Sequence, residues 1–306
     1  MRLSDQSLGF YAKFYEKIPI YLDLYPAFFR FFYAISLDLE ALGLSGWIST
    51  LLKDYVLKHE LHICETSDVR RMEVRNLLHR SGVSLSAGED KALLSRVNRF
   101  LGNASNFKRF NKPVFYDVTH LILFQTNLGQ EKMNVTEGLK ETLSSVGVLA
   151  YLDDDIDLLS EVCICFKILD LKCPELWQQT CVNFLKDFKI TIASTDSPPK
   201  IPRSDDYHIY LVGSWFKLKF GFKAFEETFN IGASYFEKPE WGHSTLRSLS
   251  QYLHKASFSQ EGMRREIPIK PDQIFNARQI KVWEKAKDIT PNAHSLLGDI
   301  SKGLIV

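Results

Sequence analysis

The sequence predicts an all-α fold in which successive helices pack as antiparallel pairs. Apolar residues recur at intervals of three and four along most of the chain, which is the period of a helix with one buried face. Proline, glycine and asparagine breaks divide the chain into segments of ordinary helix length. No alternating run of useful length indicates a sheet. The 306 residues suffice for one large helical domain or two ordinary ones.

The composition excludes several classes of protein. Hydrophobic residues make up 45% of the chain and charged residues 25%, a globular balance that excludes wholesale disorder. The net charge of +1 gives no electrostatic attraction to nucleic acid, so no nucleic-acid partner is expected. Many aromatic residues gather before position 34, but charged residues such as Lys17, Asp23 and Arg30 interrupt them before about 20 apolar residues accumulate. We therefore expect core helices and no integral membrane span, with a peripheral lipid-facing surface as the alternative.

The cysteines and the first residues predict a cytoplasmic protein. Residues 1–5 contain no apolar segment of a cleaved export signal. The five cysteines are an odd number and include no C-x-x-C pair. Buried free thiols in a reducing compartment are the interpretation we favour.

The first half of the chain divides at proline, glycine and cap residues. These breaks predict helices over residues 8–25, 27–42, 47–64, 68–80 and 90–101. Pro26 separates the first two, Thr66 and Ser67 supply N-cap chemistry for the fourth, and Gly82 ends it.

The second half of the chain continues the pattern. Its breaks predict helices over residues 113–127, 135–151, 156–170, 174–188, 207–220, 223–235, 241–256 and 272–287. Residues 189–193 are expected to extend briefly, and the Ser-, Asp- and Pro-rich residues 191–206 form the best internal boundary. The domain prediction is a helical domain over 1–257 followed by a tail over 258–306 with one helix.

Three of these helices carry polar residues on otherwise apolar surfaces. In the helix over 113–127, Tyr116, Thr119, His120 and Asn127 fall at helical spacing on one face. Asp157 and Glu161 lie four residues apart on the helix over 156–170. Tyr207 and His208 open the helix over 207–220. An unpaired buried polar group costs about 1–3 kcal/mol. Each of these rows of polar residues, here called a polar stripe, must therefore face hydrogen-bonding partners, water or a cavity.

The spacing of these helices predicts that the stripes converge. Positions 120 and 161 are 41 residues apart and positions 161 and 208 are 47 apart, with one helix between the members of each pair. A helix-pair unit of this size is typical of curved α/α arrays. If alternate helices line the inside of such an array or of a toroid, the three stripes meet in one cavity.

The segments around residues 116–129, 157–161 and 207–208 resemble those of uncharacterised bacterial all-helical repeat proteins with an α/α-toroid-like fold, associated with secondary metabolism. The resemblance covers residues 60–215. It implies the helical-repeat fold and brings no assigned activity.

An acidic corner offers a different chemistry. Asp153, Asp154 and Asp157 satisfy the D-D-x-x-D pattern with which the all-α class I isoprenoid synthases bind Mg²⁺ and a diphosphate. No second metal motif follows downstream, and the preceding helix is expected to stop before the acidic run. An acidic N-cap at a helix start is the simpler interpretation.

The leading hypothesis is an enzyme of small-molecule or natural-product biosynthesis that uses acid–base chemistry as a lyase, isomerase or cyclase. The predicted catalytic residues are Glu161, His120, His208 and Asp157. The predicted substrate-binding residues are Tyr116, Asn127 and Tyr207. A buried carboxyl beside a histidine gives a proton donor and a proton acceptor. These four catalytic candidates form no H-x-x-x-H or E-x-x-H pair among themselves, so no metal ligand is assigned. The alternatives are a non-catalytic helical scaffold that binds a peptide or protein, and an isoprenoid synthase that needs Mg²⁺.

Overall fold

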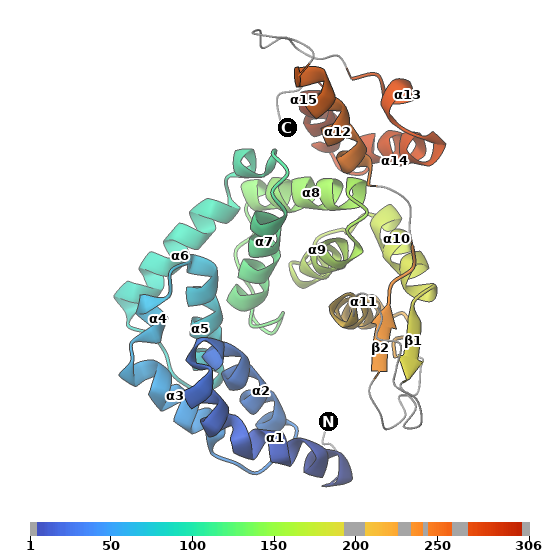
Figure 1. The fold of residues 1–306 in the computed structure, drawn as a ribbon. Coiled ribbons are helices and arrows are strands. Elements are labelled where there is room, and N and C mark those ends of the chain that lie inside the picture. Colours follow the sequence, from blue (N-terminus) through green and yellow to red (C-terminus); the bar gives the residue numbers. More distant parts are fainter. Residues whose placement is uncertain (1–4, 193–205, 226–233, 241–243, 259–268, 302–306) are drawn as a thin grey trace. The chain divides into compact units, whose positions relative to one another are not determined.

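A computed structural model describes residues 5–192, 206–225, 234–240, 244–258 and 269–301. Within these ranges the chain forms fifteen α-helices, two short 3₁₀ helices and two short strands, so the all-α prediction is confirmed (Figure 1). None of these helices is both long enough and apolar enough to cross a bilayer.

The chain forms two compact units. Unit 1 comprises Met1–Arg99 and His120–Glu131, and unit 2 comprises Phe100–Thr119 and Lys132–Val306. One helix, α7 (Lys112–Gln125), contributes its first half to unit 2 and its second half to unit 1. Of the predicted boundary at 191–206, residues 193–205 lie outside the described part of the chain.

Unit 1 is built on the aromatic N-terminal segment. Its helices are α1 (Asp5–Leu24), α2 (Phe29–Ala41), α3 (Ile48–Lys58), α4 (Leu61–Cys64), α5 (Asp68–Arg80) and α6 (Ala87–Leu101), with η1 (Pro26–Phe28) between the first two. The helix α2 packs against α1, α3 and α5. Phe29, Phe32 and Tyr33 are buried there against Leu52 and Leu78, so these aromatic residues form core as expected.

The sequence-based boundaries in unit 1 were partly wrong. The predicted helix over 47–64 is interrupted, because Glu60 has a φ of 50° in the left-handed region and separates α3 from α4. Ser67 caps α5 as predicted, with its hydroxyl accepting from the Arg70 amide. Gly82, at a φ of 75°, follows the end of that helix.

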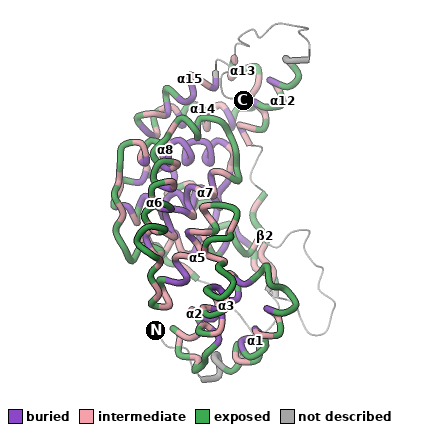
Figure 2. The backbone as a smooth tube through the Cα atoms, turned by 90° about the vertical axis from the view of Figure 1, so that its left-hand side faces the viewer, coloured by how far each residue is buried: buried purple, intermediate pink, exposed green. Residues whose placement is uncertain are grey.

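Unit 2 is built around α9 (Ile156–Ile168), which packs against α8 (Glu137–Leu152), α10 (Glu175–Lys186) and α11 (Tyr207–Lys219). Residues 158–166 of α9 are all buried, because the helix is apolar around nearly its whole circumference. Figure 2 shows the buried backbone concentrated around α8. The short helix η2 (Ala104–Phe107) also packs on α8.

Two strands, β1 (Lys189–Ile192) and β2 (Ser234–Glu237), pair antiparallel with Lys189 opposite Glu237. The short extended segment predicted at 189–193 is therefore confirmed. The predicted helix over 223–235 was wrong, since residues 222–225 are not helical and Ser234 and Tyr235 belong to β2. Residues 226–233 lie outside the described part of the chain.

The C-terminal region contains more helix than predicted. It consists of α12 (Thr245–Phe258), α13 (Pro271–Ile274), α14 (Ala277–Lys287) and α15 (Ala293–Ser301). The predicted single helix over 272–287 is interrupted at Phe275, which is extended, and Asn276 then caps α14 through a capping box with Gln279. The helices α12, α14 and α15 pack on α8.

Candidate functional site

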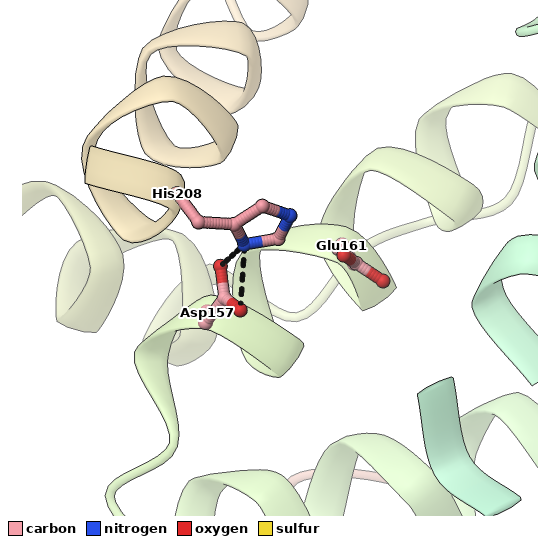
Figure 3. A group of neighbouring side chains, drawn as sticks. All are labelled: Asp157, Glu161 and His208. Carbon is pink, nitrogen blue, oxygen red and sulfur yellow. Dashed lines mark hydrogen bonds and ion pairs between the residues drawn. The ribbon is translucent and has the colours of Figure 1, made fainter. Parts of the chain in front are cut away.

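The candidate site begins with a histidine–aspartate pair between α9 and α11. Asp157 lies in the first turn of α9, after the N-cap Asp155, and its side chain is 13% exposed. His208 lies in the first turn of α11, and its Nδ1 is 3.0 Å from each carboxylate oxygen of Asp157 (Figure 3). Because α9 and α11 pack along each other, the pair is fixed by the core of unit 2.

A third helix also reaches Asp157. The hydroxyl of Tyr116, on the unit 2 half of α7, donates to Oδ2 of Asp157 at 2.8 Å. Burial raises the pKa of Tyr116, and the negative charges of Asp155 and Asp157 raise it further. The phenol therefore keeps its proton and remains a donor at neutral pH.

Glu161 lies one turn beyond Asp157 on the same face of α9 and is 3% exposed. The hydroxyl of Thr119 on α7 donates to Oε2 of Glu161 and also lies 3.0 Å from the carbonyl of Tyr116. This hydrogen bond joins Glu161 on α9 to the unit 2 half of α7.

The ring of His208 is both oriented and accessible. The hydrogen bond to Asp157 raises the pKa of His208, the charges of Asp157 and Glu161 act in the same direction, and burial opposes them. Since Nδ1 faces Asp157, the other ring nitrogen, Nε2, lies on the edge of the ring away from that carboxylate (Figure 3). The side chain is 55% exposed, so solvent and small molecules reach it.

The same residues also form a potential metal site. One donor atom from each of Asp157, Glu161 and His208 lies within 4.8 Å of the others. Carboxylate and imidazole are ligand types that Zn²⁺, Mn²⁺ and Fe²⁺ accept in proteins. The expectation that the site holds no metal stays a prediction.

The structure brings together four of the seven residues predicted for the site: Tyr116, Asp157, Glu161 and His208. His120 belongs to unit 1, where its ring centroid is 5.9 Å from that of Phe124. Tyr207 is 52% exposed on α11. Thr119 was not chosen, although its position three residues after Tyr116 on the same face indicated it.

Asn127 does not continue the polar face of α7, and that part of the prediction was wrong. The helix ends at Gln125, and Asn127 and Leu128 have φ values of 47° and 56° in the left-handed region. In unit 1, the side-chain oxygen of Asn127 accepts from Nδ2 of Asn76 at 3.1 Å.

The carboxylates of the acidic corner contact different partners. Asp153 accepts from the Ser244 hydroxyl, Asp154 lies 3.8 Å from the guanidinium of Arg278, and Asp157 pairs with Tyr116 and His208. Within the described residues, Asp153 and Asp154 join no three-ligand cluster. Asp155 is the N-cap of α9, as the simpler interpretation expects.

Comparison with known proteins gives a family but no activity. Neither the curated proteins nor the solved structures contain a significant match to the chain. A model of one protein family, the Domain of unknown function (DUF6902), matches residues 1–288. Because this match covers nearly the whole sequence, the chain belongs to the DUF6902 family.

Proposed function

We propose that the protein is an enzyme that moves protons on a small organic substrate at the centre formed by Asp157, Glu161 and His208. One observation carries the proposal: the His208 ring is held at Nδ1 by the shielded carboxylate of Asp157, while 55% of the His208 side chain is exposed. In acid–base enzymes, a carboxylate placed in this way orients the imidazole and stabilises its protonated form.

The electrostatics support a proton-donor role for His208. Because Asp157 raises its pKa, more of the imidazole is protonated near neutral pH than in an isolated histidine. A proton delivered from Nε2 leaves an imidazole that is able to recover it from the next water or substrate. A general acid placed in this way contributes roughly 10²–10⁴-fold to a rate.

Glu161 supplies the second proton-transfer group. It lies on the same helix face as Asp157 and accepts a hydrogen bond from the Thr119 hydroxyl. A donor and an acceptor at one centre support elimination, isomerisation or cyclisation, in which one proton leaves the substrate and another is added. We accordingly propose a lyase, isomerase or cyclase of small-molecule biosynthesis.

The cytoplasm is the proposed location. All five cysteines are free thiols, and four of them are buried in unit 2. Free thiols persist in a reducing compartment.

The test follows consumption of small molecules from a metabolite extract by mass spectrometry. The wild-type protein is expected to convert at least one component, while E161Q and H208Q are expected to lose about 10²-fold or more of that rate. The control is H294Q, which removes an exposed histidine of α15 in the same unit. Circular dichroism must show all variants folded.

Two results would oppose the proposal: no conversion by the wild type, or equal conversion by all variants. Either result favours the non-catalytic scaffold. Repeating the assay after EDTA treatment, with Mn²⁺ or Zn²⁺ resupplied, separates two mechanisms at the same residues. Conversion that returns only with a cation assigns Asp157, Glu161 and His208 as metal ligands, whereas conversion without it supports direct proton transfer.

A further inference from the structure

A pocket lies in unit 2, and Asp157, Glu161 and His208 are not among the residues that line it. It is bounded by residues 108–110, the C-terminal end of α8, the first turns of α12 and the end of α15. Its volume is about 620 Å³. Protein sites for small organic ligands occupy about 300–1,000 Å³, so the pocket is large enough for one.

The floor of the pocket is apolar. Leu149, Leu246, Leu249 and Ile300 line it, together with the aromatic ring of Phe110. Leu249 and Ile300 are buried, which fixes the floor as part of the packing of α8, α12 and α15. Such a surface favours a ligand with an apolar body, because burying apolar area contributes about 25 cal/mol per Å².

Three cationic side chains also belong to the pocket lining. Lys108, Arg109 and Arg247 all line the pocket. The Nζ of Lys108 is 3.2 Å from Asp299 and is partly neutralised by it. Within the described part of the chain, the guanidinium groups of Arg109 and Arg247 form no ion pair, so their positive charges are available to a ligand.

One carboxyl also faces the pocket. Asp153 accepts a hydrogen bond from Ser244, and burial raises its pKa, while the charges of Lys112 and Arg247 oppose that rise. Because the lining contains three cationic side chains and one carboxyl group, its net charge is positive. Asp153 would repel a second negative charge on the ligand, so a ligand with a single anionic group fits best.

We propose that this pocket binds an amphipathic monoanion, a small molecule with an apolar body and one terminal carboxylate. Arg109 and Arg247 hold the carboxylate, for which planar guanidinium groups are suited by shape and charge. The leucine floor holds the apolar body. This binding function is separate from proton transfer at His208, and its failure would leave that proposal intact.

Isothermal titration calorimetry of the full chain with decanoate tests the proposal, with decanol as the uncharged analogue. Decanoate is expected to bind, and decanol to bind at least about tenfold more weakly, because each 1.4 kcal/mol of charge interaction is a factor of ten. The variant R109Q/R247Q is expected to weaken decanoate binding by at least about tenfold. The matched control R70Q/R99Q removes the same charge from exposed arginines of α5 and α6.

A second variant, S250W, places a large side chain in the pocket at an exposed position of α12 and leaves the arginines intact. It is expected to block decanoate as well. The proposal is overturned by absence of decanoate binding to the wild type, by equal affinity for decanol, or by retained binding in both R109Q/R247Q and S250W. Equal losses in R70Q/R99Q would also overturn it, since the effect would then follow net charge alone.

Discussion

At the scale of single residues, the pair of His208 and Asp157 sets the chemistry of the candidate site. The pair joins an exposed imidazole to a carboxylate that is 13% exposed. Because the pKa of His208 is raised in the folded protein, the pair stabilises the fold below the ordinary histidine value of about 6.5. That contribution is lost as pH rises through the folded value.

The substitution D157N tests this account of His208. Asparagine retains a hydrogen-bonding oxygen but removes the charge, so the pKa of His208 should fall toward about 6.5. NMR titration of the imidazole C–H signals measures the shift. His294, exposed on α15, serves as the internal reference in the same spectra. An unchanged titration of His208 in D157N would contradict the assigned cause.

Local spacing predicted which of these side chains share a helix face. Asp157 and Glu161 are four residues apart and Tyr116 and Thr119 three apart, so helical geometry alone puts each pair on one face. Asn127 was wrongly placed on the polar face because α7 ends at Gln125 and the backbone of Asn127 is left-handed. The pairing of His208 with Asp157 also depends on how α11 packs along α9. Residue spacing within one helix does not predict such packing between helices.

At the scale of elements, one glycine of α8 makes room for the indole of Trp177 on α10. A Cβ atom added at Gly147 would lie 2.3 Å from Cη2 of Trp177, whose side chain is fully buried. G147A should therefore destabilise the protein by about 1–3 kcal/mol through overpacking.

The control for this prediction is G298A in α15, where nothing lies within 4 Å of the added atom. It should stabilise the helix by about 0.5–1 kcal/mol, because alanine loses less backbone entropy. Urea denaturation measures both free energies of unfolding. Equal stability of the two variants would refute the packing role of Gly147.

Helix existence was easier to predict than helix ends and strands. The helix break at Glu60 depends on a left-handed backbone at a residue that is not glycine. The break at Phe275 precedes a capping box, and the apolar pattern continues through it without interruption. The strand β2 was mistaken for helix because its partner, β1, is distant in sequence. Pairing between strands that are far apart in the sequence produces no periodic pattern in the local sequence.

At the scale of the whole molecule, the cysteines distinguish the two units. Cys64 in unit 1 is exposed, and the four cysteines of unit 2 are buried: Cys163, Cys165, Cys173 and Cys181. Burial raises the pKa of the Cys163 thiol, and its neighbours Cys173 and Cys181 add to the rise. A buried thiol that keeps its proton is a poor nucleophile.

Ellman's reagent should therefore label about one thiol in the native protein and all five in guanidinium chloride. The variant C64S should lose the fast native reaction while the total in denaturant falls by one. Rapid native labelling of C64S would show that unit 2 exposes its thiols. The all-α class was predictable at this scale, whereas the curved array or toroid stays a prediction, because spacings of 41 and 47 residues describe neighbouring helices only.

The helix α9 carries both site carboxylates and also supplies the centre of the unit 2 core. Substitutions along α9 can therefore reduce either the stability of the fold or the activity of the site. A change at buried Val162 or Ile164 lowers the amount of folded protein without altering the site residues themselves. Assays of α9 variants in cells would measure abundance unless the concentration of protein is normalised. Asp157, at the partly exposed first turn, is the position where chemistry is most readily separated from abundance.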